Sequence, residues 1–330
     1  MQLQTHIDIK PFEQKINHSQ PILSIGSCFA DNIAKRLQHS KFQTVASPTG
    51  ILFNPESIAN TLDKLTLFAN ADAAKRLIEA ELRNTDGRWY NYNFHSVFCD
   101  SDKSHATDKM VSAHMAGVNA LQRAGIVIIT FGTAWAYYLK ECGEVVANCH
   151  KQPQSLFSRQ LLSVEHIAKR YDKLLSDGAL AQKRVIFTVS PIRHLADGAE
   201  DNSLSKATLR VAIAEIVRNH SNAEYFPSFE IVNDELRDYR FYANDMTHPS
   251  QLAIDYIWER FSDAAFSPST QKLIERVARI NAAVAHRPFN PESDSYRTFC
   301  RRQLEEIKEL ESINTDIDWS KEKAYFANYL

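Results

Sequence analysis

The feature that most constrains the fold is a set of short apolar runs, each ending in small or polar residues. Three of them, Pro21–Gly26, Ile126–Gly132 and Arg184–Ser190, are nearly continuous, as expected of strands buried on both faces of a parallel sheet. Phe226–Val232 and the weaker Phe42–Ala46 complete the predicted strands. In such sheets ligands bind beyond the carboxyl ends of the strands, so the residues that follow each strand are candidate functional residues.

Helical patterns alternate with these runs, and this alternation predicts a doubly wound α/β sheet. The predicted helices cover Ala30–His39, Asn54–Ala80, Ser163–Ser176, Ser205–His220 and Pro249–Ser262.

Two regions fall outside the alternation. Residues 82–114 are rich in aromatic and amide side chains, which predicts an insertion over the strand ends. Residues 267–330 contain two helical patterns, Gln271–Ala285 and Ser293–Ile313, separated by a proline-containing segment. Because their aliphatic stripes would otherwise be exposed, we predict a helical hairpin packed on the domain formed by residues 1–266.

Composition excludes several classes of protein. The 330 residues include 38 Lys and Arg against 40 Asp and Glu, a formal charge of −2. The chain therefore has no net positive electrostatic field that would attract nucleic acid. No apolar stretch approaches the ~20 residues that span a bilayer, and the N-terminal segment is polar where a secretory signal is apolar. The 5 cysteines, without a CxxC pair, suit a reducing compartment. We therefore predict a cytoplasmic protein with no membrane contact; its oligomeric state stays open.

Known ligand motifs are also missing. The sequence has no GxxxxGK[ST] phosphate loop, no GxGxxG after a strand, and no His or Cys pairs at metal-ligand spacing. We expect neither a cofactor nor a metal.

Two potential nucleophiles, Ser27 and Cys28, follow Gly26 where the first predicted strand runs into a helix. A helix N-terminus offers unpaired N–H groups and the positive end of the helix dipole, which lower a thiol pKa and hold an oxyanion. The alternative is that Ser27 only caps the helix and Cys28 is a small core residue.

A carboxylate and an imidazole, Asp245 and His248, stand three residues apart ahead of the last helix of the domain. A carboxylate orients a histidine, and a histidine activates a nucleophile. The alternative is that both side chains only cap the next helix.

The segments GSCFA, NCHK, SPIRH, YFPSFEI and DMTHPS, in this order, resemble the GSCFA family, a bacterial group related to the SGNH/GDSL hydrolases. The resemblance extends from about Ile22 to His286. It implies a flavodoxin-like α/β/α sandwich with a mainly parallel sheet, and ester or acyl-transfer chemistry on a small molecule or an acylated glycan.

The resemblance also implies roles for individual residues. His248 matches the general base and Asp245 the residue that orients it. Aligned without gaps on Gly26, the hydrolase serine falls on Cys28, whose thiolate would suit acyl transfer or thioester chemistry. A shift of one residue makes Ser27 the nucleophile instead, and both alternatives stay open.

Two glycines match positions whose N–H groups help to form an oxyanion hole, Gly50 and Gly132. The asparagine usual two residues after the second glycine is Ala134 here, which leaves Thr133 or Asn148 as substitutes.

Further polar side chains are candidates for substrate binding at the rim of the site: Asn148, His150, Lys151, Arg193, His194 and His95. Arg193 could grip a carboxylate or phosphate with both arms of its guanidinium, or form an ion pair with Glu230 or another nearby acid. Structural roles are equally open for each of them.

The sequence therefore predicts an SGNH-like hydrolase or acyltransferase that acts on an ester, a thioester or a related acyl group. The alternative from another class is a non-catalytic or weakly catalytic binding module. Such a module would use the rim rich in His, Arg and Lys to recognise a polar ligand, such as a glycan or an anionic metabolite.

Overall fold

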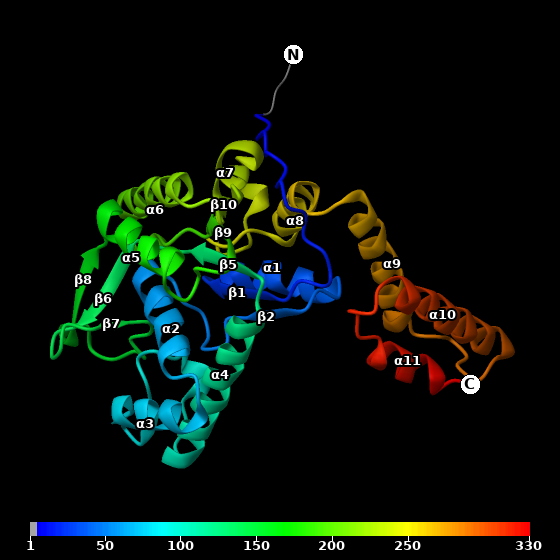
Figure 1. Ribbon diagram of the computed structural model, residues 1–330, viewed down its shortest axis with the longest axis horizontal. Helices are drawn as coiled ribbons and strands as arrows, with labels where there is room; N and C mark the ends of the chain where they lie inside the picture. The colour runs from blue at the N-terminus through cyan, green and yellow to red at the C-terminus, as the bar shows by residue number, and fades with distance from the viewer. Residues whose placement is uncertain (1–4) are drawn as a thin grey trace.

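A five-stranded parallel sheet forms the centre of the molecule in the computed structural model, which describes residues 5–330 (Figure 1). Its strands lie in the order β10-β9-β5-β1-β2. Their bounds are β1 (Ile22–Gly26), β2 (Thr44–Ala46), β5 (Ile126–Phe131), β9 (Arg184–Val189) and β10 (Ala223–Tyr225). Numbered within this sheet alone, the order is 2-1-3-4-5, the flavodoxin-like arrangement. The predicted α/β fold class is confirmed.

Helices cover both faces of the sheet because successive residues of each buried strand point to opposite sides. Ile128 of β5 packs in the core that contains Ile257, whereas Ile129 packs in the core that contains Leu62. The first face is covered by α1 (Cys28–His39) and α8 (Gln251–Ala265). The second face is covered by α2 (Pro55–Leu67), α4 (Lys103–Arg123), α5 (Val164–Ser176) and α6 (Ala199–Asn219).

Smaller elements lie outside this sandwich. A helix and a two-stranded hairpin follow α2: α3 (Ala71–Glu81), β3 (Arg83–Thr85) and β4 (Arg88–Tyr90). A separate antiparallel sheet consists of β6 (Trp135–Leu139), β7 (Val145–Val146) and β8 (Phe157–Leu161). Single helical turns are η1 (Ser96–Phe98), η2 (Gln154–Leu156), η3 (Leu195–Asp197), α7 (Ser228–Glu230) and η5 (Tyr239–Phe241), and η4 (Ile231–Leu236) is a π-helix.

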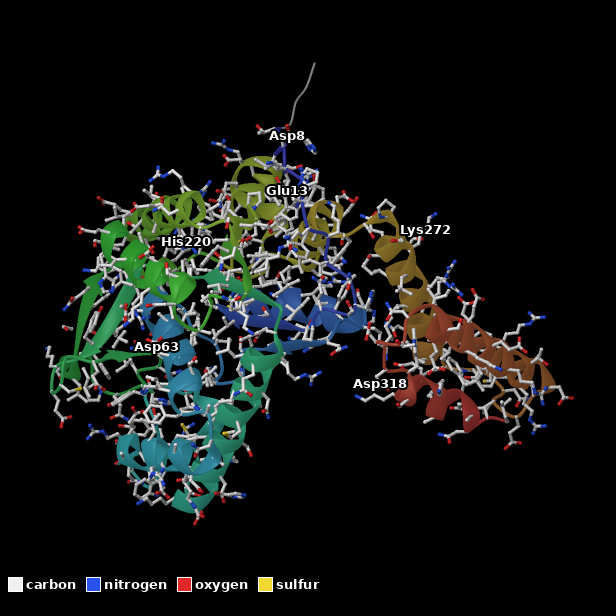
Figure 2. All side chains as sticks on the ribbon, viewed as in Figure 1. Asp8, Glu13, Asp63, His220, Lys272 and Asp318 are labelled. Atoms are coloured by element: carbon white, nitrogen blue, oxygen red, sulfur yellow. The ribbon has the colours of Figure 1, made fainter. Side chains whose placement is uncertain are left out.

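The C-terminal helices α9 (Pro268–Ala285), α10 (Asp294–Ile313) and α11 (Ser320–Ala327) enclose a core of their own. Asp318, labelled in Figure 2, lies where this unit meets α1: the Lys41 Nζ donates to its carbonyl oxygen at 2.9 Å and pairs with Glu322 at 2.7 Å. The first two helices correspond to the predicted hairpin, and α11 is an addition to it.

The predicted strand Phe226–Val232 is wrong. Strand β10 ends at Tyr225, and the run continues as α7 and the π-helix η4. Pro227, which has no N–H to give a strand ladder, marks the change. The apolar side chains of Phe226, Ile231 and Val232 are still buried, but Ile231 and Val232 belong to a helix rather than to a strand.

The predicted helix Asn54–Ala80 is two helices. α2 ends at Leu67, and Asn70 starts α3 by accepting a hydrogen bond from the Ala73 N–H at 2.9 Å. The predicted excursion over 82–114 ends earlier than expected, because α4 begins at Lys103. Within residues 5–330, no helix is both long and apolar enough to span a bilayer.

Candidate active site

The turn from β1 into α1 depends on a glycine. Gly26 has φ +141°, and a Cβ there would lie 2.2 Å from the Thr130 carbonyl oxygen of the neighbouring strand. Only glycine allows this conformation and this approach. Ser27 then caps the helix, its Oγ accepting from the Phe29 N–H at 3.3 Å, and Cys28 is the first helical residue.

Cys28, His248 and Asp245 come together beyond the carboxyl end of β1. The Cys28 Sγ lies 3.7 Å from His248 Nε2, and His248 Nδ1 lies 2.6 Å from Asp245 Oδ2. Residues separated by more than two hundred positions thus form a chain of contacts from thiol to imidazole to carboxylate, which we call the triad.

The loop before α8 is folded around the Asp245 carboxylate. Its Oδ1 accepts hydrogen bonds from the N–H groups of Thr247 at 2.9 Å and His248 at 3.0 Å. Met246, at the tip of the turn, has φ +57°, and the Ala243 N–H closes the loop on the His248 carbonyl at 2.7 Å. The loop therefore fixes the imidazole relative to the carboxylate.

These contacts decide the protonation of the triad. The N–H groups of His248 and Thr247, and then the imidazole, lower the pKa of Asp245 below its usual range. An ionised carboxylate accepts a hydrogen bond, so Nδ1 of His248 donates to Asp245, and in the neutral imidazole the lone pair of Nε2 faces the Cys28 sulfur.

The Cys28 thiol is protonated at rest. Burial is the largest influence and raises its pKa, and the Asp31 charge acts in the same direction. The N–H groups of Cys28 and Phe29, and the Lys206 ammonium, act in the opposite direction but do not reverse the shift. A base that accepts the thiol proton is therefore needed for reaction.

The structure separates the two candidate nucleophiles. Ser27 is 1% exposed, and its Oγ is occupied as the helix cap. Cys28 is partly exposed and is the residue in contact with His248.

The predicted oxyanion hole is not formed by the expected N–H groups. Gly50 donates its N–H to the Ser47 carbonyl at 2.8 Å, and Gly132 and Thr133 donate to the Phe53 carbonyl at 2.8 and 2.9 Å. All three N–H groups therefore already have acceptors, the Ser47 and Phe53 carbonyls, which lie in the loop between β2 and α2. The Thr133 hydroxyl also has a partner, the Ser205 hydroxyl at 3.0 Å.

His194 lies beside this position with an unused nitrogen. Its Nε2 is buried and has no hydrogen-bond partner among the described residues. A Cβ on Gly132 would lie 3.4 Å from this nitrogen and 3.2 Å from the Ser27 Cβ, so the glycine leaves space between them. Burial, then the charges of Lys206 and His248, lower the pKa of His194 to about 4. The imidazole is therefore neutral.

Lys206 was not among the candidates from sequence. It is 2% exposed, and its Nζ donates to the carbonyls of Gly132 at 2.6 Å and Ser190 at 2.7 Å, at the ends of the two central strands. Burial lowers its pKa to about 7. A signal was present: helical spacing places Lys206 on the same buried face as Leu209 and Ile213.

The NCHK segment follows β7 of the antiparallel sheet rather than a strand of the central sheet. His150 Nε2 contacts the Asn91 carbonyl at 2.9 Å, and its Nδ1 lies 3.5 Å from the Cys99 sulfur. Asn148 accepts a hydrogen bond from the His150 N–H, and Lys151 is exposed. None of these contacts involves a triad residue, so a role of Asn148, His150 and Lys151 in substrate binding stays a prediction.

Two other rim candidates lie at the central strand ends. Arg193 donates its N–H to the Thr247 carbonyl at 3.0 Å. It therefore contacts the loop before α8 that carries Asp245 and His248, which we call the triad loop. His95 packs on Gly50, where a Cβ would lie 2.1 Å from the His95 Cβ.

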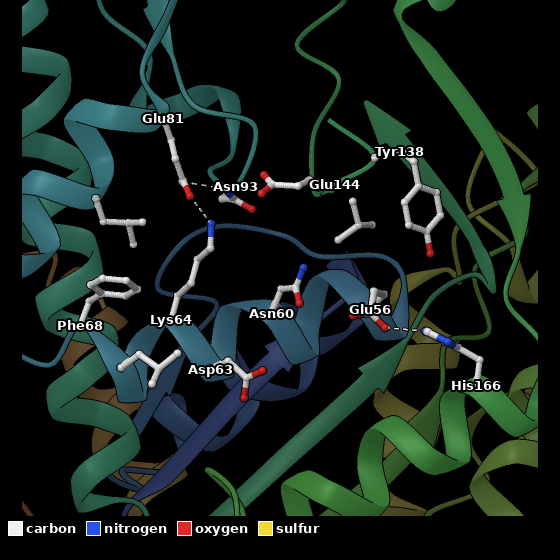
Figure 3. Close-up of a pocket in the computed structure, with 14 residues that line it drawn as sticks. Glu56, Asn60, Asp63, Lys64, Phe68, Glu81, Asn93, Tyr138, Glu144 and His166 are labelled. Carbon is white, nitrogen blue, oxygen red and sulfur yellow. Dashed lines mark hydrogen bonds and ion pairs between the residues drawn. The ribbon is translucent and has the colours of Figure 1, made fainter. Parts of the chain in front are cut away.

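A cavity of about 540 Å³ between α2 and the β6–β7 hairpin is separate from this site (Figure 3). Its main charged groups are already paired, Lys64 with Glu81 at 2.6 Å and His166 with Glu56 at 2.7 Å. No triad residue lines it. Across residues 5–330, no cluster of three or more His, Cys, Asp or Glu side chains is arranged to hold a metal.

Comparison with known families gives two matches. The profile of the GSCFA family matches residues 21–261, which is most of the chain and includes the whole triad. The chain belongs to the GSCFA family. A second profile, that of the GSCFA domain protein C-terminal domain, matches residues 277–330, which cover the end of α9 together with α10 and α11. No curated protein matches the chain.

Proposed function

We propose that this GSCFA protein is a thiol-dependent acyl-transfer enzyme, a hydrolase or acyltransferase. It would take the acyl group of an ester or thioester, carried by a small molecule or a glycan, onto Cys28. The observation that carries the proposal is the Cys28–His248–Asp245 chain of contacts at 3.7 and 2.6 Å. The sheet order and the closing Asp-x-x-His also support a relation to the SGNH/GDSL hydrolases.

In the first step His248 Nε2 takes the thiol proton as the Cys28 sulfur attacks the acyl carbonyl carbon. A C–S bond forms and the carbonyl oxygen becomes an oxyanion. When the tetrahedral adduct collapses, the bond to the leaving group breaks and the leaving group takes the proton from His248. Water or an acyl acceptor then repeats the sequence in reverse on the thioester.

The oxyanion would be held by the N–H of Cys28 and by His194. Cys28 is the first residue of α1, where an N–H has no partner inside the helix. His194, as the tautomer with the proton on Nε2, would donate from a buried nitrogen that has no other partner among the described residues. It would replace the amide donor absent at Ala134.

The test combines labelling and turnover. Iodoacetamide is expected to alkylate Cys28, faster as pH rises toward 9 because burial raises the thiol pKa. Wild-type protein is expected to turn over short acyl thioesters, and His248→Ala to lower the rate about 10²–10⁴-fold. Equal rates in both proteins would favour the binding module instead. An adduct of a fluorophosphonate on Ser27 would contradict the assignment of Cys28.

His194→Ala is expected to lower acyl turnover about 10²–10³-fold, the usual effect of removing one oxyanion donor. Alkylation of Cys28 by iodoacetamide passes through no oxyanion, so its rate is expected to stay the same. Measuring both rates separates oxyanion stabilisation from a general disturbance of the site. A parallel loss of both rates would show that His194 only supports the structure.

A further inference from the structure

A second cavity, of about 250 Å³, lies beside the triad loop, and two arginines, Arg193 and Arg237, line it together with Tyr239 and Tyr242. Arg193 connects it to the triad. Its N–H donates to the Thr247 carbonyl at 3.0 Å, and its guanidinium to the Met246 carbonyl at 3.3 Å. The cavity therefore adjoins the loop that carries His248.

The Arg193 guanidinium forms no ion pair with any carboxylate of residues 5–330, and its Cζ lies 5.6 Å from the centroid of the Tyr242 ring. Glu230, which the sequence offered as a partner, is paired with Arg210 at 2.9 Å instead. The acids of residues 234–238 also have other partners: Asp234 with Arg237 at 3.8 Å, Glu235 with Arg260 at 3.8 Å, and Asp238 with Arg240 at 2.9 Å. Arg193 thus keeps most of its donors for a ligand.

Arg237 enters the same cavity from the end of the π-helix η4. It has φ +23°, a strained conformation for a residue with a side chain, held by a hydrogen bond from its N–H to the Val232 carbonyl at 3.0 Å. Its side chain forms an ion pair with Asp234 at 3.8 Å, and because both groups are exposed this pair is weak. Asp238, the acid in the cavity lining, forms an ion pair with Arg240 at 2.9 Å.

The phenol of Tyr242 adds a neutral donor. Burial is the largest influence on its pKa and raises it, so the hydroxyl keeps its proton. The cavity therefore presents two guanidinium groups and a phenol, a set that matches the oxygens of a carboxylate or phosphate.

We propose that this cavity binds an oxyanionic group, a carboxylate or a phosphate, on the substrate of the Cys28 site. The proposal rests on the proposed function and narrows it to acyl compounds that carry negative charge a short distance from the reacting carbonyl. Two cations beside the loop that carries His248 would raise the local concentration of such substrates.

The test uses two pairs of chloroacetamides that alkylate Cys28, and one member of each pair carries an oxyanionic group. Chloroacetyl-β-alanine is compared with its neutral amide, and chloroacetyl-phosphoethanolamine with chloroacetyl-ethanolamine, at low salt. The anionic member of at least one pair is expected to react about tenfold faster or more, and the pair that shows the larger ratio identifies carboxylate or phosphate. Arg193→Gln and Arg237→Gln are expected to bring both ratios toward one.

Arg301→Gln, which removes an exposed charge on α10, is the matched control and is expected to leave the ratios unchanged. Equal rates for charged and neutral reagents in the wild type, or ratios that survive both arginine substitutions, would overturn the anion site while leaving the thiol site standing. Failure of every reagent to label Cys28 would overturn the proposed function and the anion site together.

Discussion

Replacing Cys28 by serine is expected to lower acyl turnover at least about a thousandfold, the range seen when a nucleophile is removed from a catalytic unit. The substitution replaces one small side chain by another of similar shape at a partly exposed position, so the fold is expected to be retained. A serine hydroxyl is a weaker nucleophile than a thiolate, and its shorter C–O bond increases the present 3.7 Å separation from His248 Nε2.

The matched control is the neighbouring residue. Ser27→Ala removes the cap on the Phe29 N–H and is expected to cost about 1 kcal/mol of stability while leaving turnover within a few-fold of the wild type. Turnover of thioesters and urea unfolding, measured on both variants, check the two effects separately. Loss of turnover in Ser27→Ala with activity retained in Cys28→Ser would reverse the assignment of the nucleophile.

Replacing Lys206 by methionine is expected to lower the free energy of unfolding by more than Ser27→Ala does. The substitution leaves the buried carbonyls of Gly132 and Ser190 without their donor, at about 1–3 kcal/mol each. Unfolding in urea at pH 9 is expected to show a loss of about 2–6 kcal/mol relative to the wild type.

The same variant tests how the contribution of Lys206 to stability depends on pH. Burial lowers the pKa of Lys206 to about 7, against 10.5 for the free side chain. Below pH 7 the folded and unfolded chains both hold the proton. Between these two values the unfolded chain binds more protons, so the contribution of Lys206 to stability increases with pH, by up to about 1.4 kcal/mol per unit. The neutral amine still has two hydrogens for the two carbonyls.

The stability difference between wild type and Lys206→Met is therefore expected to be smaller at pH 6 than at pH 9. Lys169→Met, on the exposed side of α5, is the control and is expected to show no such trend. A difference that is constant from pH 6 to pH 9 would show that the Lys206 ammonium is not destabilised by burial.

The central strands could be predicted because strands buried on both faces are continuous apolar runs, as in β5 and β9. The same pattern failed at Phe226–Val232, where buried helical turns have a similar composition. A proline inside that run was the available warning. The break between α2 and α3 was missed because Asn70, a strong helix cap, lies within a stretch whose apolar periodicity continues on both sides.

For the site, local sequence was sufficient where chemistry is carried by neighbouring residues. The Asp245–His248 spacing already implied a carboxylate that orients an imidazole, and the turn places them 2.6 Å apart. It was insufficient where backbone partners matter. The N–H groups of Gly50, Gly132 and Thr133 are donated to carbonyls of loops whose paths the sequence does not specify.

The sequence by itself determined the strand-to-helix turn at Gly26, the two candidate nucleophiles and the Asp-x-x-His pair, because each depends on residues close together in the chain. Only the tertiary structure decided that Cys28 rather than Ser27 faces His248, since that depends on how α1 and the loop before α8 meet. It also decided that His150 contacts Asn91 and Cys99 rather than a triad residue, and that Lys206 lies at the ends of the two central strands. Which side chains share a site is fixed by the packing of the elements that carry them, and helical or strand periodicity specifies only one face of each.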